Sequence, residues 1–238
     1  VSNDESAFLL IGFSSADDDT LIFRNNIFHF NNCGDNDLIS HDADIFTVEE
    51  CIIDSNIANN IIISGHGHPC TYNIFNSAIY KNITKNSLIS AYVSAERYHG
   101  DYVSVRNNTI VSNESNNTIF SGYYCDNIYV NNTIIGNSSK KYIFQDPHHP
   151  YFVGNIFLGN VYAEKFDIND EKDDAVFKYN VMPLFVASSV SGAGLYKPDF
   201  TNIVSDYYID RIKGELDFFS EIDDISDVKD RSADIATL

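Results

Sequence analysis

The sequence is poor in several residues that support particular classes of protein. It has no Trp, one Met, five Pro and four Cys among its 238 residues. Basic residues are also scarce, because 15 Lys and Arg stand against 34 Asp and Glu and leave a formal net charge of −19. A surface with this charge repels phosphate backbones, which excludes nucleic-acid binding and disfavours other anionic polymers. No apolar run approaches the roughly 18 residues that a bilayer-spanning helix needs, so we predict no membrane insertion.

Asparagine and isoleucine are abundant, at 27 and 29 residues. Ile, Val, Tyr and Phe suit β-strands, whereas Asn and Gly suit tight turns. Hydrophobic residues make up 44% of the chain, enough to build a core, so the chain is not predicted to be disordered. This mixture favours many short strands joined by Asn-rich corners and argues against a helical bundle.

A repeat of 23 to 31 residues runs along the chain. Each repeat ends at an anchor asparagine, and the six anchors are Asn31, Asn56, Asn82, Asn113, Asn137 and Asn160. Three residues before the anchors stand the apolar residues Phe28, Ile53, Ile79, Ile110, Ile134 and Phe157. Eight residues before them stand Phe23, Val48, Ile74, Val105, Tyr129 and Phe152. Two apolar columns in one frame indicate two short strands in every repeat.

A corner and a third strand complete the repeat. Five and six residues before each anchor stands a pair such as Asn107-Asn108 or Gly154-Asn155. Asn and Gly tolerate the left-handed backbone of a sharp corner. After the first five anchors come the apolar segments 38–40, 62–64, 88–90, 119–121 and 143–145. Three short strands separated by corners form one coil of a parallel β-helix.

We therefore predict an all-β fold, a right-handed parallel β-helix of about seven coils, with 9–11 in the first coil and 180–185 in the last. The pattern from Ala7 to about Val186 resembles the pectin-lyase-like superfamily. The Asn-Asn-Thr-Ile segments at 107–110 and 131–134 are most similar to adhesin-like β-helix repeats of prokaryotic cell surfaces. That superfamily contains lyases, hydrolases, epimerases, phage tailspikes and non-catalytic adhesins, so the resemblance implies a fold rather than one activity.

The two ends of the chain differ from the repeat. We assign residues 1–190 to the β-helix and residues 191–238 to an acidic C-terminal cap or tail, irregular or helical, because the period stops there. Ile212, Leu216 and Phe219 recur as on one helical face, and such a cap would cover the open end of the stack. The chain begins with Val and enters a coil almost directly, so we expect a mature or excised piece of a longer protein.

The four cysteines do not predict disulfides. Cys70 and Cys125 share a position in the repeat but stand two coils apart, which places their Cα atoms about 9–10 Å apart, beyond the limit of about 7 Å. Cys33 and Cys51 occupy different columns. We predict free and mostly buried thiols.

The loops after the third strand gather His, Tyr and carboxylate residues. Six of the seven histidines fall in these loops, and stacked coils would bring the loops into one strip. Aromatic rings pack against the C–H faces of sugars, and polar tips bond their hydroxyls. We predict substrate-binding roles for His41, Asp42, His68, Tyr92, Tyr98, Tyr124, Asp146, His148 and His149. If the strip is catalytic, the residues that could supply acid and base are His66, His99, Arg97 and Tyr123.

These residues lead to three hypotheses. The first is a secreted or cell-surface module, from a prokaryote or phage, that binds polysaccharide or a surface glycan along the strip as an adhesin. The second is a polysaccharide lyase or glycoside hydrolase that uses the same strip. The third is a structural spacer of a surface fibre or phage tailspike. Separately from these three, self-association of the chain end to end or side by side is a further expectation. We predict no metal site and no cofactor, with calcium at Asp42, Asp44 and Asp146 as the alternative.

Overall fold

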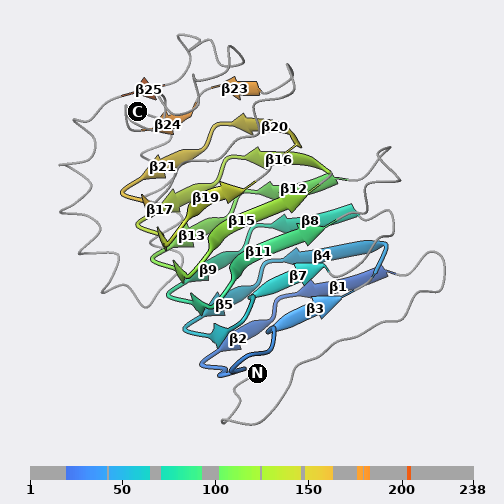
Figure 1. Ribbon diagram of the computed structural model, residues 1–238. Coiled ribbons are helices and arrows are strands. Elements are labelled where there is room, and N and C mark those ends of the chain that lie inside the picture. Colours follow the sequence, from blue (N-terminus) through green and yellow to red (C-terminus); the bar gives the residue numbers. More distant parts are fainter. Residues whose placement is uncertain are drawn as a thin grey trace.

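The chain folds into a parallel β-solenoid, in which each turn contributes one strand to each of four sheets (Figure 1). The computed structural model describes residues 20–41, 43–64, 71–92, 102–123, 125–145, 148–162, 176–178, 180–182 and 203–204. Every regular element within these residues is a β-strand, and every strand pairing is parallel. Two sheets hold five strands each, so the described part makes about five turns.

Sheet A contains β1 (Thr20–Arg24), β4 (Ile45–Glu49), β8 (Thr71–Phe75), β12 (Tyr102–Arg106), β16 (Asp126–Val130), β20 (His148–Val153) and β23 (Val176–Lys178). Sheet B contains β2 (Ile27–His29), β5 (Ile52–Asp54), β9 (Ala78–Tyr80), β13 (Thr109–Val111), β17 (Thr133–Ile135), β21 (Ile156–Leu158), β24 (Val181–Met182) and β25 (Ile203–Val204). Their inward positions are the two apolar columns predicted from the sequence, and both columns line the core.

Sheet C contains the two-residue strands β6 (Ile57–Ala58), β10 (Ile83–Thr84), β14 (Glu114–Ser115), β18 (Ser138–Ser139) and β22 (Val161–Tyr162). Sheet D contains β3 (Ile39–His41), β7 (Ile62–Ser64), β11 (Ser87–Tyr92), β15 (Thr118–Tyr123) and β19 (Tyr142–Gln145). Each coil therefore has four strands rather than the three predicted. The strand register also corrects one predicted alignment. The repeat frame aligns the segment 62–64 with 38–40, but Ile62 pairs with Ile39, so the segment is shifted by one residue.

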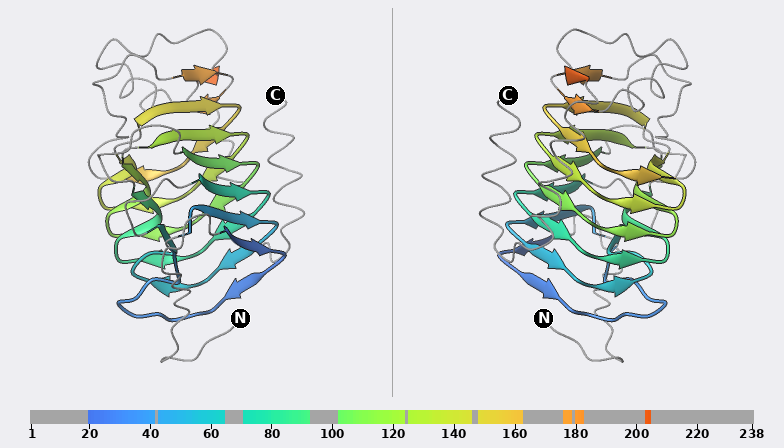
Figure 2. Two further views of the ribbon diagram at one scale, coloured as in Figure 1. Left: turned by 90° about the vertical axis from the view of Figure 1, so that its right-hand side faces the viewer. Right: turned by 90° about the vertical axis from the view of Figure 1, so that its left-hand side faces the viewer.

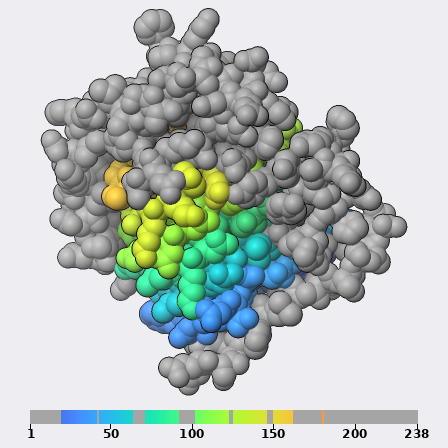
Figure 3. Space-filling model, viewed as in Figure 1, coloured from blue at the N-terminus to red at the C-terminus, as the bar shows by residue number. Residues whose placement is uncertain are grey.

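The core is a stack of side chains from successive coils, because in-register parallel strands place equivalent residues one above another. Aromatic rings stack in this way where Tyr129 lies on Phe152, with centroids 4.8 Å apart, and Phe120 on Phe144, at 4.7 Å. The coils follow one another in chain order in both side views (Figure 2) and form a continuous surface in the space-filling view (Figure 3). Cys33, Cys51 and Cys125 are buried free thiols, as predicted; Cys70 lies outside the described residues.

Five of the six anchor asparagines are buried inside the corners, and Asn160 is half-buried. The left-handed backbone falls on the residue before each anchor, such as Lys81 and Ser112, both with φ of 54°. The anchors themselves form a ladder in which each side-chain oxygen accepts hydrogen bonds from the asparagine one coil earlier. Asn108, Asn132, Asn155 and Asn180 form a second ladder at the corner between sheets A and B. The left-handed backbone predicted for the corner pair is found at its first residue, as in Asn107 with φ of 54° and Gly154 with φ of 68°, whereas the anchors contribute hydrogen bonds.

Several predictions fall on residues that the structure does not describe. The expected first coil at 9–11 and nearly all of the expected cap at 191–238 lie outside the described residues. From the latter segment the structure describes β25, which pairs in parallel with β24 at the end of sheet B. In the described part of the chain, no helix is long and apolar enough to cross a membrane.

Candidate functional site

Five connections leave sheet D and enter sheet A at one edge of the solenoid, which we call the D–A edge. They follow β3, β7, β11, β15 and β19 and precede β4, β8, β12, β16 and β20. Because strands of neighbouring coils lie about 4.8 Å apart, these connections start and end in a column about 19 Å long. The topology therefore brings the strand ends that flank the predicted loops to the same edge.

The strand ends along the D–A edge are in register. Tyr92 pairs with Tyr123 at the end of sheet D. At the start of sheet A, Tyr102 pairs with Asp126, and Asp126 pairs with His148. Backbone pairing thus aligns residues from three successive coils at the margins of the predicted strip.

Most of the predicted site residues lie outside the described parts of the chain. This applies to Asp42, His66, His68, Arg97, Tyr98, His99, Tyr124 and Asp146. Tyr92, Tyr123, His148 and His149 are described as strand positions in β11, β15 and β20. Asp44, expected as an alternative calcium ligand, is half-buried beside the start of β4. No group of three or more His, Cys, Asp or Glu residues within the described ranges is arranged to hold a metal ion.

His41 belongs to the core and not to an exposed loop. Its side chain is 2% exposed, and its ring stacks on Phe46 with centroids 3.8 Å apart and planes 8° apart. Neither ring nitrogen has a hydrogen-bond partner. Burial without a partner lowers the pKa of His41 from 6.5 to about 3, because desolvation penalises the charged form. A ring enclosed in this way does not reach a ligand on the surface, which corrects the substrate-binding role expected for it.

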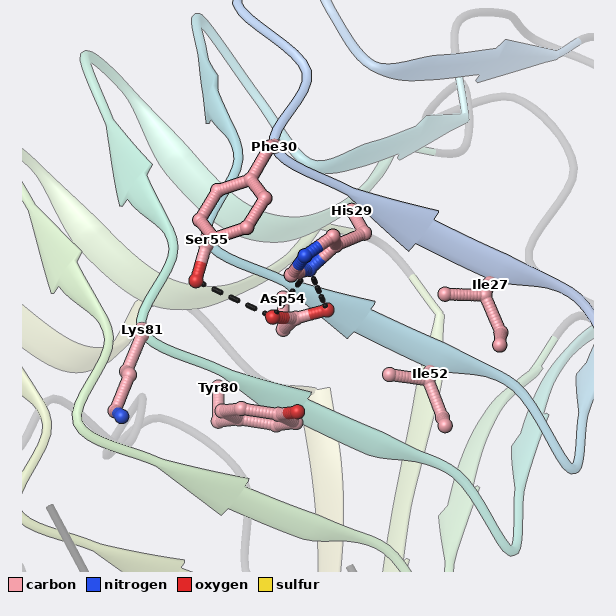
Figure 4. A pocket seen from close by; sticks show the side chains of 8 residues that line it. All are labelled: Ile27, His29, Phe30, Ile52, Asp54, Ser55, Tyr80 and Lys81. Atoms are coloured by element: carbon pink, nitrogen blue, oxygen red, sulfur yellow. Dashed lines mark hydrogen bonds and ion pairs between the residues drawn. The ribbon is translucent and has the colours of Figure 1, made fainter. Parts of the chain in front are cut away.

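A groove that the sequence prediction missed lies on the outer face of sheet B. It has a volume of about 480 Å³ and is lined by Ile27, His29, Phe30, Ile52, Asp54, Ser55, Tyr80 and Lys81. These residues come from β2, β5 and β9 and from the corners that follow them (Figure 4). Adjacent strands place His29, Asp54 and Tyr80 in one outward column.

A His–Asp pair stands at the centre of this groove. His29 Nδ1 lies 2.8 and 2.7 Å from the two carboxylate oxygens of Asp54, and Ser55 Oγ donates to Oδ2 at 3.2 Å. Asp54 is 5% exposed, whereas the His29 side chain retains 41% of its surface. The ring of His29 also contacts Phe30, with centroids 3.6 Å apart. The carboxylate is thus enclosed while the imidazole reaches the groove.

The repeat frame contained a signal for this groove. His29 is the one histidine outside the predicted loop strip, and it stands two residues before an anchor. The same column reads His29, Asp54, Tyr80, Val111, Ile135 and Leu158 along the chain. Its change from polar to apolar after the third coil marks the coils that form the groove.

The comparisons with known proteins do not extend this description. The sequence matches no protein-family model, and neither the curated proteins nor the solved structures contain a match to it. The class that the chain defines by its own geometry is that of parallel β-solenoids.

Proposed function

We propose that this solenoid is a polysaccharide-binding module of an extracellular or cell-surface protein, and that the polymer lies along the D–A edge. The observation that carries the proposal is the register of the strand ends, which aligns Tyr92 with Tyr123 and Tyr102 with Asp126 and His148. A column of Tyr, His and Asp positions aligned by the backbone suits a ligand that is itself a repeating chain.

The residue types favour a sugar polymer over other elongated ligands. Tyr combines an apolar ring face with a polar tip, which suits the C–H faces and hydroxyl groups of sugar rings. The formal net charge of −19 works against polyanions. We therefore expect a neutral polysaccharide rather than a uronate or sulfated polymer.

Affinity electrophoresis in gels that contain neutral or uronate polysaccharides tests this proposal. We expect one or more neutral polymers to retard the protein. The Tyr92→Ala, Tyr123→Ala double variant should weaken that binding at least tenfold, equivalent to about 1.4 kcal/mol. Tyr142→Ala is the matched control. Tyr142 is the first residue of β19, so it lies at the edge of sheet D away from the D–A edge, and its substitution should leave retardation unchanged.

Two results would contradict the proposal. The first is the absence of retardation by every polysaccharide, and the second is binding that the double variant retains in full. Mass spectrometry of the incubated polymers separates binding from cleavage. Detection of unsaturated or hydrolysed oligosaccharides would show that the protein is a lyase or hydrolase at the same edge rather than a binding module. The residues to mutate next would then be His66, His99, Arg97 and Tyr123.

A further inference from the structure

The His–Asp pair on sheet B has the geometry of a general base. An ionised carboxylate only accepts hydrogen bonds, so the proton between His29 and Asp54 resides on His29 Nδ1. In the neutral imidazole the other nitrogen, Nε2, is then the acceptor. Ser55 donates to the same carboxylate and holds it in place. A buried carboxylate that fixes the tautomer and orientation of a histidine is the arrangement that enzymes use to accept a proton from a nucleophile.

The coils of this solenoid can stack without a His–Asp pair at this position, as the rest of the same column shows. Tyr80 follows Asp54 in this column, and the three coils after Tyr80 fill the same outward position with Val111, Ile135 and Leu158, all of them buried. Asp54 is enclosed as well, and a buried carboxyl group costs folding free energy unless its oxygens are hydrogen-bonded. A paired histidine and aspartate at the open end of an apolar column therefore point to a chemical role.

The walls of the groove indicate what kind of ligand fits. Ile27 and Ile52 lie side by side at one side of the His–Asp pair, and Phe30 lies at the other (Figure 4). Ile27 is 54% exposed and Phe30 is 61% exposed, so both offer apolar surface that a ligand would cover. The His–Asp pair therefore lies between apolar side chains on two sides of the groove. This distribution suits a small molecule with one reactive polar group and a short apolar chain.

We propose that this groove hydrolyses esters of short-chain carboxylic acids, with His29 as the general base. His29 Nε2 takes a proton from a water molecule, whose oxygen attacks the ester carbonyl carbon. The C–O bond to the alcohol then breaks, and the imidazolium returns the proton to the departing alkoxide. The products are a carboxylic acid and an alcohol, and the histidine is regenerated. Lys81 lines the same groove, and its positive charge favours the oxyanion of the tetrahedral intermediate.

This proposal is independent of polysaccharide binding at the D–A edge, because its residues lie on sheet B. Hydrolysis of p-nitrophenyl acetate, butyrate and palmitate by the full chain tests it. We expect turnover of the acetate and butyrate above the buffer rate, and little turnover of the palmitate, whose acyl chain and nitrophenyl group together exceed a groove of about 480 Å³. His29→Gln keeps a side-chain N–H donor for Asp54 but removes the base, and should lower the rate at least about a hundredfold.

Asp54 is a positioning residue, so its test needs a readout besides rate. In Asp54→Asn, long-range ¹H–¹⁵N spectra of the histidines should show the His29 proton moving from Nδ1 toward Nε2, together with loss of turnover. Lys140→Gln is the control for nonspecific hydrolysis by surface amines, since Lys140 is exposed after β18 and lies outside the groove. Turnover no faster than buffer, or turnover that His29→Gln retains while its circular dichroism stays native, would overturn the proposal.

Discussion

The side chain of Asn82 donates a hydrogen bond to Oδ1 of Asn113 in the next coil at 2.9 Å. The same oxygen accepts the backbone N–H of Asn82 at 3.0 Å, and the Asn82 side chain also donates to the carbonyl of Ile53 in the preceding coil at 2.8 Å. One asparagine therefore connects three coils. Because both Asn82 and Asn113 are fully buried, water cannot replace these bonds.

Asn113→Ala should destabilise the solenoid by about 3 kcal/mol, because it leaves two donors of Asn82 and the Oδ1 of Asn137 short of a partner. Urea denaturation followed by circular dichroism measures the change in the free energy of unfolding. Asn116→Ala is the control, since Asn116 is exposed and should shift that free energy by less than about 0.5 kcal/mol. Equal effects of the two substitutions would contradict a structural role for the ladder.

His41 should make the fold sensitive to acid. The pKa of His41 is about 3 in the folded chain and 6.5 in the unfolded chain. Between these two pH values the unfolded chain binds a proton at His41 and the folded chain does not. The contribution of His41 to stability is complete above about pH 6.5 and is lost progressively as the pH falls toward 3. At pH 4.5, two units below 6.5, the loss should be about 2.7 kcal/mol.

The variant His41→Phe isolates this contribution from the other titrating groups. Phe has no nitrogen to protonate and can still stack on Phe46. Its free energy of unfolding, measured by urea denaturation at pH 7.5 and at pH 4.5, should fall less with acidification than that of the unmodified chain. An identical pH dependence in both proteins would show that His41 is not buried as a neutral group.

Inward and outward positions of the solenoid should differ in how much a charged substitution destabilises the fold. Ile134 is fully buried in the inward column of sheet B, whereas Ile83 is 45% exposed on sheet C. Ile134→Asp should cost about 4 kcal/mol or more and abolish cooperative folding, because it buries a carboxylate without a partner. Ile83→Asp should remain soluble and melt within a few degrees of the parent, as followed by calorimetry. A cooperative Ile134→Asp protein would show that this column does not line the core.

The buried thiols should resist alkylation. Burial raises the pKa of both Cys33 and Cys51, which lowers the fraction of reactive thiolate. In a Cys70→Ser background, the three remaining thiols should react with iodoacetamide at least roughly a hundredfold more slowly in the native protein than in urea. Mass spectrometry counts the modified residues, and rapid native labelling of Cys51 would contradict its burial at the A–B corner.

The apolar columns could be predicted from the sequence because a solenoid converts sequence period directly into spatial stacking. Phe28, Ile53 and Ile134 share a column in the sequence and share the inward face of sheet B in the structure. The fourth sheet could not be predicted in this way. Its strands are two residues long, and Glu114–Ser115 and Ser138–Ser139 carry no apolar signal, since hydrogen bonds to neighbouring coils define them.

The two candidate sites also differ in how far the sequence could predict them. The gathering of Tyr92 and Tyr123 at one edge follows from the period alone, and the register places them together. The burial of His41 could not be predicted from its place in the sequence, because the repeat pattern does not indicate that its ring stacks on Phe46. The groove around His29 could not be predicted from loop composition, because its histidine lies within strand β2 and its partner Asp54 is 25 residues away in the sequence.

The sequence by itself determined that this chain is a β-solenoid, because a repeat of 23 to 31 residues with inward apolar columns can bury those columns only by stacking one coil on the next. The tertiary structure alone decided which polar side chains meet. His29 and Asp54 are 25 residues apart, and Asn82 and Asn113 are 31 apart, yet both pairs form hydrogen bonds between neighbouring coils. Such contacts depend on strand register, and a shift of one residue turns every side chain to the opposite face.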